Sequence, residues 1–299
     1  MKLSIHKLGL VTFVVGIAAA LPAQTSTQIG NDTERGLTEV ESIQSTINSQ
    51  ERLFKVDSNV GWEFSQHFSV YGGVPLYFVN VPSSTTTVGG VTTTTPSTSH
   101  NGLGNVYLGF LLKGSSPQLD YAGVLTMAAP TASTKDGLSS GRATIDLDNR
   151  IQHSFGMFTP FFDGGVGNSV PDSMLFSRPF TSLGFITHLE EGAGFKLTSR
   201  FSVNGSAYQI IPAGNQKIYS KLVGQGAKGS GKNVFQTSAT ASGSGLTREN
   251  GFNAWVQFEP VPAMDLAVGY TRSETFGLNS LAFNLRMNFG KLLRPKRNL

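Results

Sequence analysis

The chain has 299 residues, of which 39% are hydrophobic and 14% are charged, with 35 glycines and no cysteine. Soluble domains carry roughly 25% charged residues, so this chain has too little charge for an ordinary soluble domain. A membrane β-barrel has such a profile, because its lipid-facing apolar residues alternate with polar residues facing the lumen. The absence of cysteine also excludes a lipoprotein anchor.

The formal net charge of +4 comes from the two ends of the chain. Without Lys2 and Lys7 the charge is +2, and without the four cations of residues 290–299 it falls to −2. The body of the chain has no basic stripe with interleaved aromatic residues, which argues against a nucleic-acid-binding surface. We interpret residues 290–299 as a basic, solvated C-terminal tail.

The N-terminus predicts a secretory signal peptide over residues 1–23. Lys2 and Lys7 supply the positive start, residues 8–20 the apolar run, and Leu-Pro-Ala at 21–23 a cleavage site. The apolar run is shorter than the about 20 residues that cross a bilayer. A retained anchor is the alternative. Residues 24–36 are predicted to form an N-terminal periplasmic segment before a barrel over residues 37–289.

The first predicted element, residues 37–48, is ambiguous. Leu37, Val40, Ile43 and Ile47 would line one face of a helix, but the stretch also fits a strand. We favour a strand, because bacterial single-chain barrels have an even number of strands.

Alternation of apolar and polar side chains predicts the remaining strands. In the clearest case, Phe54, Val56 and Val60 share one face, opposite Lys55 and Asp57. The predicted strands are 54–64, 68–78, 105–113, 121–129, 143–152, 158–167, 183–197, 201–211, 252–258, 264–271 and 280–289.

The connections that follow residue 64 alternate between short and long. Short periplasmic turns and longer extracellular loops are typical of outer-membrane barrels. We therefore predict an all-β fold, a transmembrane antiparallel up-and-down β-barrel of about 12 strands, within a range of 10 to 14. The Thr-rich and Gly-rich joints 79–103 and 212–248 are predicted to be solvated and mobile, with a loop folded into the lumen as the alternative.

The same alternation places a mixed set of charges and aromatic residues on the inward face. The candidate lumen-lining residues are Lys55, Asp57, Glu63, Tyr71, Tyr107, Lys113, Asp146, Asp148, Arg150, Asp163, His188, Glu190, Lys196, Asp265 and Arg286. Tyr77, Phe161 and Trp255 have the same parity. An interior of this kind suits either a narrow water-filled path or a closed, salt-bridged lumen.

Enzyme, metal and cofactor motifs are weak. The histidines have no metal-ligand spacing, and no nucleophile elbow or Walker loop is present in the sequence. We therefore expect no enzymatic activity, no cofactor and no metal site.

Three short motifs carry a family resemblance: Tyr-Gly-Gly-Val-Pro-Leu-Tyr-Phe at 71–78, Gly-Leu-Gly-Asn-Val-Tyr at 102–107, and Val-Leu-Thr-Met-Ala-Ala-Pro-Thr at 124–131, which leads to Gly137. The chain resembles the outer-membrane transporters grouped as the "MetA-pathway of phenol degradation" family. That resemblance implies an outer-membrane barrel that passes hydrophobic or aromatic compounds. The chain departs from the family pattern in two places. Asn105 stands where an acidic residue is common in the family, and a basic tail follows Phe289. No residue role is carried over.

Two functional hypotheses follow. The leading one is an outer-membrane channel or passive transporter for small solutes. The family resemblance implies that these solutes are hydrophobic or aromatic. The alternative is a non-conducting structural or surface-interaction barrel that acts through its extracellular loops. Both place the protein in the bacterial outer membrane, with membrane lipid and the barrel assembly machinery as partners, and neither involves nucleic acid.

Phe289 ends the last predicted strand, and we interpret it as the aromatic signal that barrel assembly machinery reads. Phe289→Ala is expected to reduce the fraction of heat-modifiable, folded protein in membranes. Truncation directly after Phe289 is expected to preserve assembly. Gel migration before and after boiling measures both, and equal folded fractions for Phe289→Ala and the unaltered chain would contradict the assignment.

Overall fold

The computed structural model describes residues 36–47, 52–81, 83–88, 91–95, 97–117, 119–222 and 239–289. The predictions for the signal peptide, for residues 24–35 and for the basic tail lie outside these residues. Within the described part of the chain, no helix is long and apolar enough to cross a membrane.

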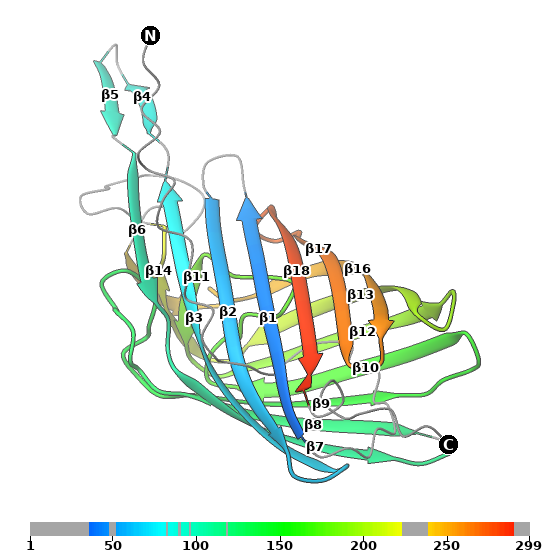
Figure 1. The fold of residues 1–299 in the computed structure, drawn as a ribbon. Coiled ribbons are helices and arrows are strands. Elements are labelled where there is room, and N and C mark those ends of the chain that lie inside the picture. The colour runs from blue at the N-terminus through cyan, green and yellow to red at the C-terminus, as the bar shows by residue number, and fades with distance from the viewer. Residues whose placement is uncertain are drawn as a thin grey trace, which may run out of the picture.

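Long antiparallel strands make the wall of the molecule (Figure 1). They are β1 (Gly36–Ile47), β2 (Arg52–Glu63), β3 (Phe68–Val81), β7 (Tyr107–Ser115), β8 (Asp120–Ala128), β9 (Thr144–Gln152), β10 (Phe158–Gly167), β12 (Ile186–Lys196), β13 (Phe201–Pro212), β16 (Glu249–Val261), β17 (Met264–Ser273) and β18 (Leu278–Asn288). Shorter strands lie in the connections between the wall strands: β4 (Ser84–Val88), β5 (Val91–Thr95), β6 (Thr98–Leu103), β11 (Phe180–Leu183), β14 (Asn215–Ser220) and β15 (Thr240–Ser244).

The wall closes on itself. Each wall strand pairs antiparallel with its neighbours along the chain, and β1 pairs with both β2 and β18, so the first and last strands meet. The predicted 12-strand antiparallel barrel is confirmed. Residues 37–47, whose pattern was ambiguous, belong to β1. Closure of the barrel has a physical reason, because it removes the edge strands that would leave backbone groups unpaired in lipid.

The two ends of the barrel differ as the joint lengths predict. Residues 64–67, 116–119, 153–157, 197–200 and 262–263 connect strands at one end, which we call the short-turn end. The opposite end, the long-loop end, carries the connections 82–106, 129–143, 168–185 and 213–248. It also carries the short connection 274–277 between β17 and β18.

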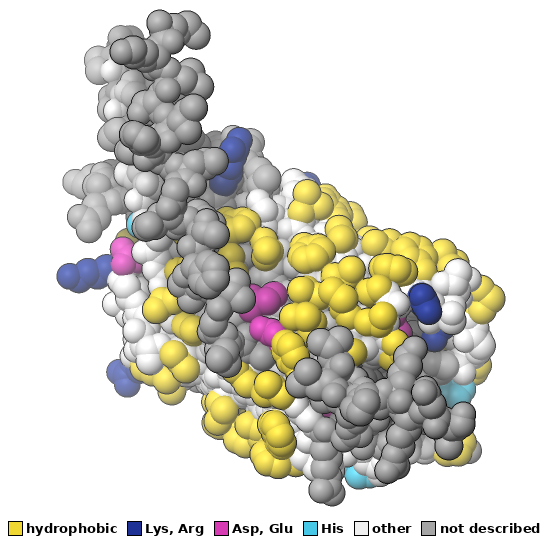
Figure 2. All heavy atoms as spheres, in the orientation of Figure 1, with side chains coloured by type: hydrophobic (Ala, Val, Ile, Leu, Met, Phe, Trp, Pro, Cys, Tyr) yellow, Lys and Arg dark blue, Asp and Glu magenta, His cyan; other side chains and the backbone are white. Residues whose placement is uncertain are grey.

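Alternate side chains separate an apolar outer face from a polar interior. On β2, Phe54, Val60 and Trp62 are exposed, whereas Lys55 and Asn59 are buried inside. Figure 2 shows many apolar side chains gathered over the strands. This is the face expected of a barrel surrounded by lipid.

Two carboxylates interrupt the apolar face at β1, where acidic side chains appear within it (Figure 2). Glu39 and Glu41 have the outward parity, since their neighbours Thr38, Val40 and Ser42 are buried. Glu41 Oε2 accepts a hydrogen bond of 2.7 Å from Ser58 Oγ on β2.

One predicted strand is divided in two. The sequence predicts a continuous strand over 183–197, but the chain turns at Gly184, which has a φ of 145°. Side chains rarely adopt this backbone conformation, so glycine sets the break. β11 therefore leaves the wall and pairs with β14, and β12 begins at Ile186.

The joints predicted to be solvated contain strands of their own. β4 and β5 form a Thr-rich hairpin in which the hydroxyls of Thr85 and Thr94 lie 3.3 Å apart. β6 continues the sheet beside the far half of β3, and β14 pairs with β15. The low apolar content of these connections predicted a mobile chain. The β-branched threonines of the first connection instead favour an extended backbone that pairs with a neighbouring strand.

Candidate functional site

Residues 168–185, which join β10 to β12, enter the lumen, and we call them the inserted loop. The loop is anchored at Asn168, whose Oδ1 accepts from Ile145 N of β9 at 2.8 Å. Its far end contacts β1, and β10 lies six strands from β1 in either direction around the ring. The loop therefore crosses the barrel from one wall to the opposite one.

The inserted loop folds into a compact turn. Ser173 N donates to Phe176 O at 2.9 Å, and Phe176 N donates to Ser173 Oγ at 3.0 Å. At the neck of the turn, Arg178 N donates to Asp172 Oδ1 at 2.8 Å. These bonds hold residues 172–178 as one unit.

Gln44 of β1 holds the turn from the opposite wall. Its Nε2 donates to Ser173 O at 2.7 Å, and its Oε1 accepts from Ser177 Oγ at 2.6 Å. Thr46 Oγ1 donates to Ser177 O at 2.9 Å. One amide side chain thus satisfies polar groups on both sides of the turn.

The tip of the turn is apolar. Met174 packs in a cluster with Val40, Tyr71 and Leu111. Leu175 packs on the other side with another cluster, made of Phe161, Trp255 and Ala282. The tip is therefore buried between walls, and the lumen is constricted at this level.

A buried ion pair fixes one side of the inserted loop. Arg178 Nε lies 2.8 Å from Glu249 Oε2, and both side chains are nearly inaccessible to solvent. Tyr208 OH donates to Glu249 Oε1 at 2.8 Å.

A second charge cluster fixes the other side. Asp172 Oδ2 accepts from Tyr77 OH at 2.8 Å and lies 3.5 Å from Lys221 Nζ and 3.8 Å from Lys55 Nζ. Burial by itself would raise the pKa of Asp172, but the ammonium groups of Lys221 and Lys55 lower that pKa to about 2. Burial lowers the pKa of Lys221 to about 8, against the opposing effect of Asp172. At neutral pH Asp172 and Lys221 are therefore both charged.

Asp57 and Tyr107 join this cluster from the barrel wall. Lys55 Nζ lies 2.9 Å from Asp57 Oδ2, and Tyr107 OH donates to Asp57 Oδ1 at 2.9 Å. The predicted residues Lys55, Asp57 and Tyr107 are thus brought together, with Tyr77 beside them.

Six other predicted residues form a cluster on β9, β10 and β12, in which all but Glu190 are buried. They are Asp146, Asp148, Arg150, Asp163, His188 and Glu190. Arg150 Nη1 lies 2.9 Å from Asp163 Oδ2. His188 lies between two carboxylates, with Nε2 3.0 Å from Asp146 Oδ1 and Nδ1 3.6 Å from Asp148 Oδ1.

The remaining predicted charges lie toward the short-turn end. Glu63 Oε1 is 3.5 Å from Lys113 Nζ and 3.7 Å from Arg286 Nη2. Asp265 pairs in register with Arg286 on the next strand, whereas Lys196 is exposed at the end of β12. The sequence-predicted residues therefore separate into three groups at different places in the barrel.

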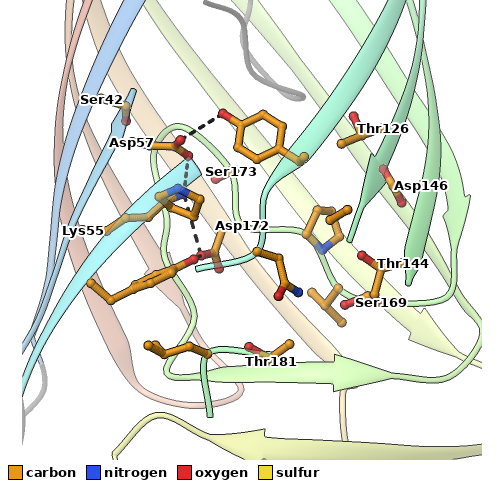
Figure 3. A pocket seen from close by; sticks show the side chains of 18 of the residues that line it. Ser42, Lys55, Asp57, Thr126, Thr144, Asp146, Ser169, Asp172, Ser173 and Thr181 are labelled. Carbon is orange, nitrogen blue, oxygen red and sulfur yellow. Dashed lines mark hydrogen bonds and ion pairs between the residues drawn. The ribbon is translucent and has the colours of Figure 1, made fainter. Parts of the chain in front are cut away.

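The inserted loop divides the interior. A cavity of about 170 Å³ lies between it and the wall made by β1, β2, β3, β7, β8 and β9 (Figure 3). A smaller space of about 20 Å³ lies on its other side, against β12 and β13. We call the larger space the upper cavity; its walls combine charged, hydroxyl and apolar side chains.

The Tyr71 ring needs a glycine beneath it. A Cβ at Gly109 of β7 would overlap that ring, which packs against Met174 of the inserted loop. Gly109→Ala is expected to destabilise the barrel by about 1–3 kcal/mol through overpacking, measured as a lower midpoint of heat-induced unfolding. Gly114→Ala on the same strand is the matched control, because a Cβ at Gly114 would have no neighbouring atom within 4 Å. Equal midpoints for the two variants would contradict this packing.

Sequence reasoning missed the residues that hold the inserted loop, namely Gln44, Asp172, Arg178, Lys221 and Glu249. Asp172 and Arg178 lie in a connection without period-two alternation, which gave no inward or outward direction for their side chains. Lys221 lies in a connection that was predicted to be solvated. Among the described residues, no group of three or more His, Asp or Glu side chains is arranged to hold a metal ion.

Comparison with solved structures finds outer-membrane barrels. The fold is similar to that of an outer-membrane channel from Pseudomonas putida F1, with a TM-score of 0.57 and 12% identity, covering 89% of this chain and 100% of that one. The KdgM porin matches with a TM-score of 0.47 and 6% identity, and the NanC porin with 0.45 and 9%; each match covers 83% of this chain and 98% of the other. No protein-family model and no curated protein sequence matches the chain. The chain thus shares the barrel fold of the Pseudomonas putida channel.

Proposed function

We propose that the protein is a channel of the bacterial outer membrane through which small solutes pass. The observation that carries this proposal is a closed barrel, apolar outside and polar inside, whose interior retains a cavity of about 170 Å³ beside the inserted loop. Barrels of about eight strands are filled by side chains and those of sixteen to eighteen are open, so this barrel is wide enough for a narrow path. The role is transport rather than catalysis.

The solutes that we propose are hydrophobic or aromatic. Tyr77 and Tyr107 line the cavity beside the inserted loop, whereas Tyr71, Phe161 and Trp255 are buried against the tip of that loop. The two lining rings support a site at which an apolar ring exchanges contact with water for contact with aromatic side chains. The motifs that resemble the "MetA-pathway of phenol degradation" family support the same solute class.

Reconstitution of the full-length protein into planar bilayers tests the channel. We expect discrete current steps, together with swelling of proteoliposomes in small-solute gradients. Absence of both, with protein that is folded by heat-modifiable migration, would overturn the proposal.

The inserted loop favours a second candidate, a non-conducting barrel that acts through its long loops. Its contacts with both walls close much of the lumen at the level of Met174 and Leu175. Deleting residues 224–237, between β14 and β15, distinguishes the two. Loss of cell-surface adhesion with no current in either form supports the second candidate, whereas current steps in both forms support the channel.

A further inference from the structure

Asp146 is a buried carboxylate of the lumen wall with one unsatisfied oxygen. Its Oδ1 lies 3.0 Å from His188 Nε2, whereas its Oδ2 is buried and has no hydrogen-bond partner. A buried acceptor without a donor is unfavourable, and more so when it is charged. A donor that a ligand brings close to this carboxylate would offset that loss.

This carboxylate lines the upper cavity (Figure 3). Lys55, Asp57 and Asp172 lie across the cavity, where their charges are paired with one another and with Lys221. On one side of the cavity the charged side chains are therefore paired with one another. On the other side the carboxylate of Asp146 has an oxygen without a hydrogen-bond donor.

The surroundings of Asp146 contain more carboxyl groups than basic groups. Four carboxylates, on Asp146, Asp148, Asp163 and Glu190, face the guanidinium of Arg150 and the imidazole of His188. Glu190 accepts hydrogen bonds from neutral groups, Ser206 Oγ and Asn253 Nδ2. This excess holds even when His188 is counted as basic, so the wall favours a cation.

The remainder of the cavity suits a small apolar body. Its lining includes Val40, Val170, Met174 and Phe180 together with the Tyr107 side chain. The volume of about 170 Å³ is close to that of an apolar cavity of about 150 Å³ that takes up benzene. One ring, or a short aliphatic chain of similar size, fits this space.

We propose that the upper cavity binds small primary ammonium compounds with an aromatic or short aliphatic body, and that Asp146 is the residue that recognises the ammonium group. An ammonium carries three donors, and its hydrogen bond to a carboxylate is charge-assisted. The apolar body lies against Met174 and Phe180. This inference rests on the proposed channel function, to which it adds a solute class.

Equilibrium binding to the full-length protein in detergent tests the inference without requiring ion flow. Isothermal titration calorimetry would compare benzylammonium, benzyl alcohol and benzoate, which share one ring and differ in charge. We expect benzylammonium to bind at least about tenfold more tightly than benzyl alcohol, and benzoate more weakly than either. In Asp146→Asn, which keeps the side-chain shape, the affinities of the amine and the alcohol are expected to become equal within about twofold.

Glu274→Gln is the matched control, since it removes one negative charge from an exposed side chain at the same end of the barrel. It is expected to retain the preference for the amine, and heat-modifiable migration verifies that every variant is folded. Equal affinities for amine and alcohol in the unaltered protein, or a preference that survives in folded Asp146→Asn, would overturn the inference. So would its loss in Glu274→Gln, because general negative charge would then explain it.

Conductance measured in parallel separates this inference from the channel function. Amine binding that depends on Asp146 in a barrel without current supports the binding site and overturns the channel. Current steps without an amine preference overturn the binding site and leave the channel in place.

Discussion

Replacing residues 172–178 by a Gly-Ser-Gly linker is expected to raise the single-channel conductance severalfold. The replaced turn carries Met174 and Leu175, which occupy the centre of the lumen between opposite walls. Its two ends lie close together, because Arg178 N bonds Asp172 Oδ1 at 2.8 Å, so a short linker spans them. Planar-bilayer recordings of the unaltered and shortened proteins measure the change.

A deletion of residues 224–237 serves as the control for that experiment, since it shortens another connection at the same end of the barrel. The control is expected to have a much smaller effect on conductance. If both deletions change the conductance equally, or if the linker variant conducts no more than the unaltered protein, the inserted loop is not the constriction.

Glu249→Gln is expected to release the inserted loop and to destabilise the barrel. The substitution leaves the guanidinium of Arg178 buried without its counter-charge at 2.8 Å, which costs about 3–5 kcal/mol. Tyr208 can still donate to the remaining oxygen, so the loss is mainly electrostatic. A lower midpoint of heat-induced unfolding and more frequent transitions to a high-conductance level would record it.

Removing both charges provides the control. In Arg178→Met/Glu249→Gln no buried charge is left without a partner, and part of the lost stability is expected to return, as a double-mutant cycle would show. If the double variant is less stable than Glu249→Gln, the ion pair does not have the role that we assign to it.

The barrel wall could be predicted from the sequence because its cause is local. Each wall strand separates lipid from the interior, so apolar and polar side chains must alternate along it, as Phe54, Lys55 and Val56 do. The same alternation gave the inward direction of Tyr71, Tyr77 and Trp255, which are buried. The local pattern of residues 37–47 fitted either a helix or a strand. The even number of strands expected of a barrel favoured a strand, and the structure has β1 there.

The contents of the lumen could not be predicted in this way. Asp172 and Arg178 lie in a connection with no periodicity, and their partners, Lys221 and Glu249, are distant along the chain. Likewise, the separation of β11 from β12 at Gly184 depends on the partner strand β14 rather than on the side-chain alternation.

The sequence by itself therefore determined the wall: the class of fold, the positions of the wall strands apart from the break at Gly184, the face that each strand turns toward lipid, and the end at which the long connections lie. These follow from the two-residue period that a boundary between lipid and water imposes on a strand. Only the tertiary structure decided how the interior is occupied, with the turn 172–178 held against Gln44 and an unsatisfied oxygen left on Asp146. Those contacts join residues that are far apart in the chain, and they form only when the closed barrel takes the loop between β10 and β12 into its lumen.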